Sequence, residues 1–270
     1  MDESLVGEIL AVVRDRTGID FSRYREGTVR RRIQNRMIAL GMEDPKAYFS
    51  LLNKQEDETI RLVERISIKV SRFYRNRETF ELIRREVLPQ LAESRQGVPL
   101  RVWSAGCGFG EEPYTLAMLL DEARLPGTVD ATDIDITALD KARKGLFPAD
   151  AFEELPPSLS ERCVERSTGS QRQVDECIRL RVRFFRHDLT SRTPPAEQPY
   201  DLVLCRNVLI YLGRQAQHHA FDSLRAAAAK DGFICLGEAE WPPLLAHTSL
   251  EPVDRRCRIF RVTTATDAPQ

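Results

Sequence analysis

The residues with the clearest potential for chemistry form a glycine-rich turn near the middle of the chain. The segment Ala105-Gly-Cys-Gly-Phe-Gly-Glu-Glu-Pro-Tyr114 has glycines at 106, 108 and 110, which let a backbone turn sharply and approach a ligand closely. A dinucleotide fingerprint would need its third glycine at Glu111, and a pyrophosphate beside Glu111 and Glu112 would meet like charge. The turn therefore favours a cationic cofactor without phosphate over NAD or ATP.

S-adenosylmethionine is such a cofactor, because it carries an α-amino group and a sulfonium. A second apolar run ends at Asp133, where an acidic side chain can accept hydrogen bonds from ribose hydroxyls. A tight turn that binds no ligand is the alternative interpretation of the glycines. The position of Asp133 at the end of the second apolar run favours the cofactor site over a turn that binds no ligand.

An α/β sheet must position these residues, and the chain pattern predicts one after a helical N-terminal part. Residues 1–86 show apolar residues at helical spacing and no β alternation, which predicts a small all-α domain and linker. In residues 87–270, short apolar runs alternate with helical segments, which predicts an open, mostly parallel sheet of Rossmann-like type. Residues from about 160 to 187 break this rhythm. There Leu180, Val182 and Phe184 alternate with arginines, which predicts a small inserted antiparallel β-subdomain.

Composition excludes several classes of protein. The 270 residues include 40 Lys and Arg against 41 Asp and Glu, with 42% hydrophobic residues, as in an ordinary globular chain. No apolar run approaches the roughly 18 residues of a membrane span, and the N-terminus lacks a basic, apolar leader. Six cysteines without a C-x-x-C pair argue against structural zinc, and we expect no metal. We expect a cytoplasmic monomer without direct membrane insertion.

The basic residues are concentrated in one predicted helix. Residues 21–40 contain six Arg and one Glu. If Val29, Ile33, Met37 and Leu40 face the core, then Arg25, Arg32 and Arg36 fall along one flank of the helix. Such a ridge suits an acidic helical partner, and a solvated face is the alternative. We expect no nucleic acid partner, because interleaved aromatic residues are missing and the isoelectric point is near 6.5.

Three strings closely resemble the chemotaxis-receptor glutamate methyltransferases, the CheR family. They are Ser104-Ala-Gly-Cys-Gly-Phe-Gly-Glu-Glu-Pro-Tyr-Thr115, Ala131-Thr-Asp-Ile-Asp135 and Cys205-Arg-Asn-Val-Leu-Ile-Tyr211. Arg72-Phe-Tyr-Arg75 is similar to the family's two aromatic residues followed by Arg, and the resemblance covers nearly the whole chain. It implies a class I methyltransferase fold for residues 87–270, with S-adenosylmethionine as cofactor and S-adenosylhomocysteine as product.

The resemblance also implies roles for individual residues. Asp133 would bind the ribose, and Asp188 and Leu189 would lie near the adenine. The full set of implied cofactor-binding residues is Lys69, Ser71, Arg75, Gly106, Glu111, Asp133, Asp188, Leu189, Arg206 and Asn207. The implied positioning residues for the acceptor carboxylate are Arg75, Arg206, Asn207 and Tyr211, and the implied partner is the cytoplasmic helical region of chemoreceptors, contacted by Arg25, Arg32 and Arg36.

The sequence departs from the family pattern at a few positions. Lys69 stands where the family usually has Asn, and it puts a cation near a cationic cofactor unless it points outward or pairs with Glu111 or Glu112. Gly237-Glu-Ala-Glu240 differs from the usual G-x-S-E at its second and third positions. Two alternatives stay open: a methyltransferase of the same fold with another protein or a small molecule as acceptor, and a regulatory module that has lost turnover.

The implied reaction needs no general base. A glutamate side chain has a pKa near 4.3 and is already an anion at neutral pH. Catalysis would consist of holding the carboxylate, methyl carbon and sulfur in line, with water excluded. The absence of a Ser-His-Asp or Cys-His constellation agrees with this mechanism.

Overall fold

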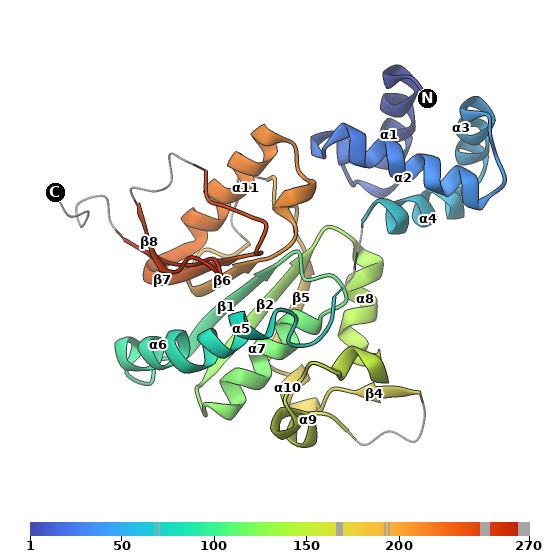
Figure 1. Ribbon diagram of the computed structural model, residues 1–270. Helices are drawn as coiled ribbons and strands as arrows, with labels where there is room; N and C mark the ends of the chain where they lie inside the picture. The colour runs from blue at the N-terminus through green and yellow to red at the C-terminus, as the bar shows by residue number, and fades with distance from the viewer. Residues whose placement is uncertain are drawn as a thin grey trace. The chain divides into compact units, whose positions relative to one another are not determined.

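The computed structural model describes residues 1–67, 69, 71–165, 170–191, 193, 195–243 and 249–263 (Figure 1). The chain forms two compact units. The first consists of Met1–Lys69 and Tyr211–Gln217, and the second of Val70–Ile210 and His218–Gln270. Within the described part of the chain, no helix is both long and apolar enough to cross a membrane.

The first unit is helical, which confirms the all-α N-terminal part. Its elements are α1 (Glu3–Thr17), η1 (Phe21–Arg23), α2 (Glu26–Ala39), α3 (Pro45–Lys54) and α4 (Glu56–Ile66). Asp44 caps α3 by accepting hydrogen bonds from the amides of residues 46 and 47, and Pro45 occupies its first turn. Val29, Ile33 and Met37 face the core as expected, but Leu40 is 37% exposed because α2 ends at Ala39.

The second unit is built on a seven-stranded sheet with the order β5-β2-β1-β6-β7-β9-β8. Its strands are β1 (Leu100–Ala105), β2 (Gly127–Asp133), β5 (Val182–Arg186), β6 (Tyr200–Cys205), β7 (Ala228–Leu236), β8 (Leu250–Asp254) and β9 (Ile259–Val262). The first five strands in this order are parallel, and β9 is antiparallel to both β7 and β8. The mostly parallel α/β sheet is thus confirmed.

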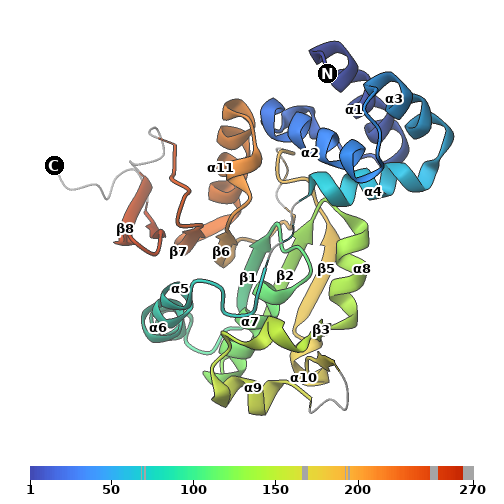
Figure 2. The same cartoon turned by 45° about the vertical axis from the view of Figure 1, so that its right-hand side comes forward.

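Helices connect and cover these strands. They are α5 (Arg77–Leu82), the π-helix η2 (Ile83–Val87), α6 (Leu88–Arg95), α7 (Glu111–Glu122), α8 (Ile136–Lys144), η3 (Ala149–Phe152), α9 (Pro157–Cys163), α10 (Glu176–Arg179), η4 (Leu209–Tyr211) and α11 (Arg214–Ala227). Figure 2 shows α8 alongside β5, where the two elements are in contact. Helix α7 begins directly after the glycine-rich turn, so its first turn faces the carboxyl end of β1.

The boundary between the units differs from the expected one near residue 86. Phe80, Ile83 and Val87 are fully buried in the same apolar cluster as Leu100 and Val102 of β1. The helical segment from residue 77 to residue 95 therefore packs on the sheet, and the second unit starts at residue 70. An amphipathic helix shows the same spacing whichever core it covers, so the pattern did not reveal its partner.

A small antiparallel sheet exists, but its composition differs from the prediction for residues 160–187. It pairs β3 (Leu146–Pro148) with β4 (Gln171–Gln173). The assignment of the alternating segment to this sheet was wrong, because Val182–Arg186 forms β5 and pairs in parallel with β2 of the large sheet. Residues 166–169 of the predicted β-subdomain lie outside the described residues.

Candidate active site

The candidate site lies at the carboxyl ends of the parallel strands. Strand β1 has β2 on one side and β6 on the other, so consecutive connections leave β1 in opposite directions. In open α/β sheets, ligands bind in the crevice at such a point. Asp133 is the last residue of β2, and the glycine-rich turn and the Arg206-Asn207 pair directly follow β1 and β6.

The glycine-rich turn has the backbone geometry that its sequence predicts. Gly106 has a φ of 75°, and a Cβ there would come within 2.4 Å of Val208 Cγ2, so only glycine fits. The amides of Gly106 and Cys107 donate to Thr132 O at 2.7 and 2.9 Å, which ties the turn to the end of β2. Gly110, with a φ of 102°, precedes the first residue of α7.

Asp133 holds the turn from the other side. Its Oδ2 accepts a hydrogen bond from the Gly108 amide at 2.9 Å, and its Oδ1 accepts one from the Asp135 amide at 3.0 Å. These bonds orient the Asp133 carboxylate beside the glycine turn at the end of β2. This arrangement suits the predicted ribose contact.

Glu111 is the most unusual group of the site. Its side chain is 5% exposed, and Oε2 is buried without a hydrogen-bond partner among the described residues. Burial raises the pKa of Glu111 from 4.5 to about 7, with a further contribution from the charge of Glu112, while a backbone hydrogen bond at the start of α7 acts in the opposite direction. A buried carboxylate without a partner is costly, so this position suits a cationic ligand.

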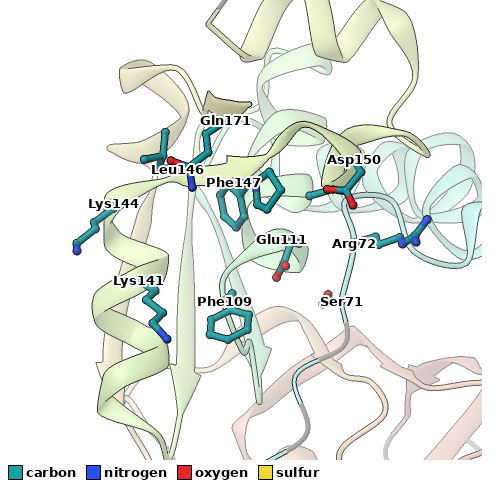
Figure 3. A pocket seen from close by; sticks show the side chains of 12 residues that line it. Ser71, Arg72, Phe109, Glu111, Lys141, Lys144, Leu146, Phe147, Asp150 and Gln171 are labelled. Atoms are coloured by element: carbon teal, nitrogen blue, oxygen red, sulfur yellow. The ribbon is translucent and has the colours of Figure 1, made fainter. Parts of the chain in front are cut away.

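Glu111 borders a cavity of about 490 Å³, a volume within the usual range of ligand pockets. Figure 3 shows its carboxylate directed into the space that Phe109 and Ser71 border. The cavity is lined by Ser71, Arg72, Phe109, Glu111, Lys141, Lys144, Leu146, Phe147, Pro148, Asp150, Ala151 and Gln171. Two residues expected at the cofactor, Ser71 and Glu111, thus share one cavity although they are 40 positions apart.

The Arg206 side chain is engaged with protein groups. Its Nη2 donates to Arg75 O at 2.9 Å and to Asn76 Oδ1 at 2.7 Å, and its Nη1 donates to Glu112 Oε2 at 3.2 Å. Ser104 Oγ donates to the other oxygen of Glu112 at 2.8 Å. Arg206 therefore holds the turn at residues 75–76 against the first turn of α7, and its direct contact with cofactor or acceptor stays a prediction.

Asp188 and Leu189 follow β5, next to the end of β2. The His187 amide donates to Asp133 O at 3.1 Å, which places this segment beside the ribose-binding candidate. Asp188 Oδ1 accepts bonds from the amide and hydroxyl of Thr190 at 2.8 and 2.7 Å and closes a local turn, and Leu189 is buried. The structure thus brings together the glycine turn, Asp133 and the predicted adenine residues.

Glu240 contacts the candidate site, and the sequence interpretation did not predict this contact. Its carboxylate accepts a hydrogen bond from the Asn207 amide at 2.9 Å. The string that contains Glu240 was noted only for its departures from the family pattern. No local signal predicts a bond between residues 33 positions apart, and the family's usual Glu at this position was the one available hint.

The remaining predicted residues belong to the first unit, and their roles at the cofactor or the acceptor stay predictions. These residues are Lys69, Tyr211, Arg25, Arg32 and Arg36. Arg25 Nε donates to Leu212 O at 3.3 Å, and Arg32 is half-buried. Arg36 differs from the expected exposed ridge, because its guanidinium donates to both oxygens of the buried Glu58, at 2.8 and 2.6 Å, and Tyr48 also donates to Glu58. Arg36 therefore supports the helical core.

The structure gives no sign of a protein metal site in the part of the chain that it describes. No group of three or more His, Cys, Asp or Glu side chains there could hold a metal ion. The donors at the candidate site are instead carboxylates, hydroxyls and backbone amides, a set that matches the amino, ribose and adenine groups of a nucleoside-linked amino acid.

Comparison with known proteins identifies the family. The description "CheR methyltransferase, SAM binding domain" matches residues 69–253, and "CheR methyltransferase, all-alpha domain" matches residues 6–67. A chemotaxis protein methyltransferase of Listeria monocytogenes is 35% identical over 85% of this chain and 87% of its own length. Proteins with the same description in Borreliella burgdorferi and Salmonella typhimurium are 28% and 30% identical, over 87% and 86% of this chain and 87% and 82% of their own lengths. This chain therefore belongs to the CheR family of S-adenosylmethionine-dependent methyltransferases.

Proposed function

We propose that this protein transfers the methyl group of S-adenosylmethionine to glutamate side chains of chemoreceptors, giving glutamyl methyl esters and S-adenosylhomocysteine. The observation that carries the cofactor half of the proposal is Glu111, a buried carboxylate with an unpartnered oxygen at a cavity. The relatives described as chemotaxis protein methyltransferases support the acceptor half.

The residues of the second unit fit the cofactor group by group. Glu111 would accept hydrogen bonds from the α-ammonium group, with Ser71 beside it, and Asp133 would accept bonds from the ribose hydroxyls. Lys141 and Lys144 also line the cavity and supply positive charge for the α-carboxylate of the same amino acid. A zwitterionic end group needs charges of both signs, and this cavity offers both.

The chemistry required of the protein is positioning. S-adenosylmethionine, when bound, supplies an electrophilic methyl group on its sulfonium. The acceptor carboxylate is ionised at neutral pH, so no side chain has to remove a proton. The chain has to align the carboxylate, exclude water and keep its own carboxylates away from the methyl group. Arg75, Asn207 and Tyr211 are the residues that we assign to the acceptor carboxylate, with Arg206 fixing the turn that carries Arg75.

Acceptor recognition is assigned to cations at the N-terminus of α2 and along it. An acidic helical receptor segment complements them, and Arg25 and Arg32 are the two cations of the predicted ridge that do not pair with Glu58. We leave Arg36 out of the contact, because its guanidinium is occupied inside the unit.

The test is methyl transfer from labelled S-adenosylmethionine to receptor-containing membranes. We expect base-labile methyl esters on receptor glutamates, and we expect receptor methylation to fall in Arg32→Glu with S-adenosylhomocysteine affinity unchanged. Arg31→Glu is the matched control, since Arg31 is exposed on the same helix and lies off the ridge. Competent cofactor binding without any receptor label would refute the acceptor half and favour another acceptor. Equal losses in both variants would refute the assignment to this flank.

A further inference from the structure

The loop that follows β6 is fastened to the loop that follows β7 by one buried carboxylate. Glu240 is 3% exposed, and its Oε2 accepts hydrogen bonds from the amides of Gly237 at 2.7 Å and Asn207 at 2.9 Å. Its Oε1 accepts a third bond, from the Ile210 amide at 3.2 Å. One side chain thus fixes both ends of the segment 207–210.

These contacts compensate the burial of a negative charge with backbone amides and without a cation among the described residues. Among the described residues, no cation forms an ion pair with Glu240, and backbone amides are its partners. Hydrogen bonds from amides to a carboxylate are charge-assisted and stronger than neutral ones. Buried charges contribute little net stability, but they impose geometry on the groups that satisfy them. The groups satisfied here belong to a loop at the candidate site.

Asn207 has a left-handed backbone conformation. Its φ is 60°, in the left-handed region, which asparagine adopts more readily than most other residues with a side chain. The amide that Glu240 binds is the Asn207 amide itself, so the bond acts on this conformation directly. With a different φ, the Asn207 side chain would point in another direction from the backbone.

Gly237 leaves the space that this contact requires. A Cβ on Gly237 would come within 2.6 Å of Glu240 Oε2 and 2.7 Å of the Asn207 nitrogen. Any larger residue would push the carboxylate away from the amide. The Glu240 amide also donates a hydrogen bond to Gly237 O at 2.8 Å, which closes a turn over residues 237–240. This turn holds the Glu240 carboxylate where it binds the loop after β6.

We propose that Glu240 is a positioning residue for the methyl transfer: it fixes the backbone of Asn207 and thereby aims the Asn207 side chain at the bound cofactor and acceptor. This inference rests on the assignment of Asn207 to the site. Glu240 touches neither ligand and acts through Asn207.

The test compares Glu240→Gln and Glu240→Ala with a matched control, Asp201→Asn. Asp201 is an equally buried carboxylate at the opposite end of β6, where it accepts a bond from the Arg101 amide and pairs with Arg95. S-adenosylhomocysteine affinity by calorimetry, kcat and KM of methyl transfer, and the melting temperature are measured for each full-length variant.

We expect Glu240→Ala to weaken S-adenosylhomocysteine binding or lower kcat by roughly tenfold or more, as expected for the loss of charge-assisted bonds. Glu240→Gln keeps one acceptor oxygen, so its loss of S-adenosylhomocysteine affinity or kcat should be smaller. Asp201→Asn should lower the melting temperature without changing affinity or kcat. Asn207→Ala should reproduce the loss seen in Glu240→Ala.

Unchanged affinity and kcat in both Glu240 variants would overturn the proposal, as would an equal loss in Asp201→Asn, which would indicate a general effect of destabilisation. If Asn207→Ala behaves as the wild type, the route through Asn207 is refuted. Failure of the wild type itself to bind S-adenosylhomocysteine would instead refute the cofactor site on which the proposal rests.

Discussion

The buried carboxylate of Glu111 predicts that cofactor affinity depends on pH in the neutral range. Its pKa is raised to about 7 by burial, so the ligand-free protein takes up a proton there as the pH falls. An ammonium ion binds the ionised form. We therefore expect S-adenosylhomocysteine to bind more weakly at pH 6 than at pH 8, and Glu111→Gln to remove this dependence together with most of the affinity.

The magnitude follows from the pKa. With a value near 7, about one molecule in ten has an ionised Glu111 at pH 6 and about nine in ten at pH 8, so affinity should change about tenfold between them. The same shift affects stability in the opposite direction. Because the folded state keeps this proton up to about pH 7 while the unfolded chain releases it near pH 4.5, the free energy of unfolding falls as the pH rises across this interval. The loss amounts to about 3 kcal/mol.

The assay is calorimetric titration with S-adenosylhomocysteine and urea unfolding of the ligand-free protein, both from pH 5 to pH 8. Glu111→Gln should come within about 1 kcal/mol of the wild type in stability at pH 5 and exceed it by about 3 kcal/mol at pH 8, while binding poorly throughout. Glu93→Gln, at an exposed carboxylate of α6, is the control and should change neither quantity. A wild-type affinity that is constant from pH 6 to pH 8, or a stability difference that does not vary with pH, would refute the reasoning.

Three further substitutions test the contacts of the two units. Asp133→Ala removes the acceptor for the amides of residues 108 and 135, and it should weaken S-adenosylhomocysteine binding at least about tenfold in calorimetry, whereas Asp140→Ala, at an exposed position of α8, should not. Arg206→Ala leaves Glu112 without its cation and frees the turn at residues 75–76, so urea unfolding should show a loss of about 3 kcal/mol, which Arg206→Lys partly restores. Arg36→Ala leaves the buried Glu58 without its cation and with Tyr48 as its remaining partner, so it should cost about 3 kcal/mol with cofactor affinity unchanged. The cost should shrink when Glu58→Gln is added, and additive losses would contradict a direct pair.

The sequence predicted which segments form helices and strands more reliably than which other elements those segments pack against or pair with. Helical spacing located the first unit, and the start of α3 at Asp44-Pro45 carries the residue types that are typical of a helix start. The same spacing in residues 77–95 did not say that this segment packs on the sheet. The alternation of apolar residues and arginines at residues 180–184 is compatible with an inserted hairpin and with a strand of the large sheet, and only tertiary pairing with β2 decides between them.

Some contacts of the candidate site were predicted from the sequence and others were not. The glycine turn and Asp133 carried a chemical signal in residue type and spacing, and the structure brings them into hydrogen-bond contact. The bonds of Glu240 to Asn207 and of Arg36 to Glu58 join residues far apart in the chain. Such pairs depend on how strands and helices are placed relative to each other, which local patterns do not encode.

The edge strands of the large sheet have a consequence for association between molecules. An unpaired edge offers free amides and carbonyls to any other extended chain, which is a route to aggregation. Strand β5, at one edge, carries Arg183 and Arg186, and Arg183 is anchored by the buried Asp130 at 2.7 Å. Strand β8, at the other edge, contains Pro252, which has no amide hydrogen to donate, between Glu251 and Asp254. Both edge strands thus carry residues that disfavour edge-to-edge pairing with a neighbouring molecule.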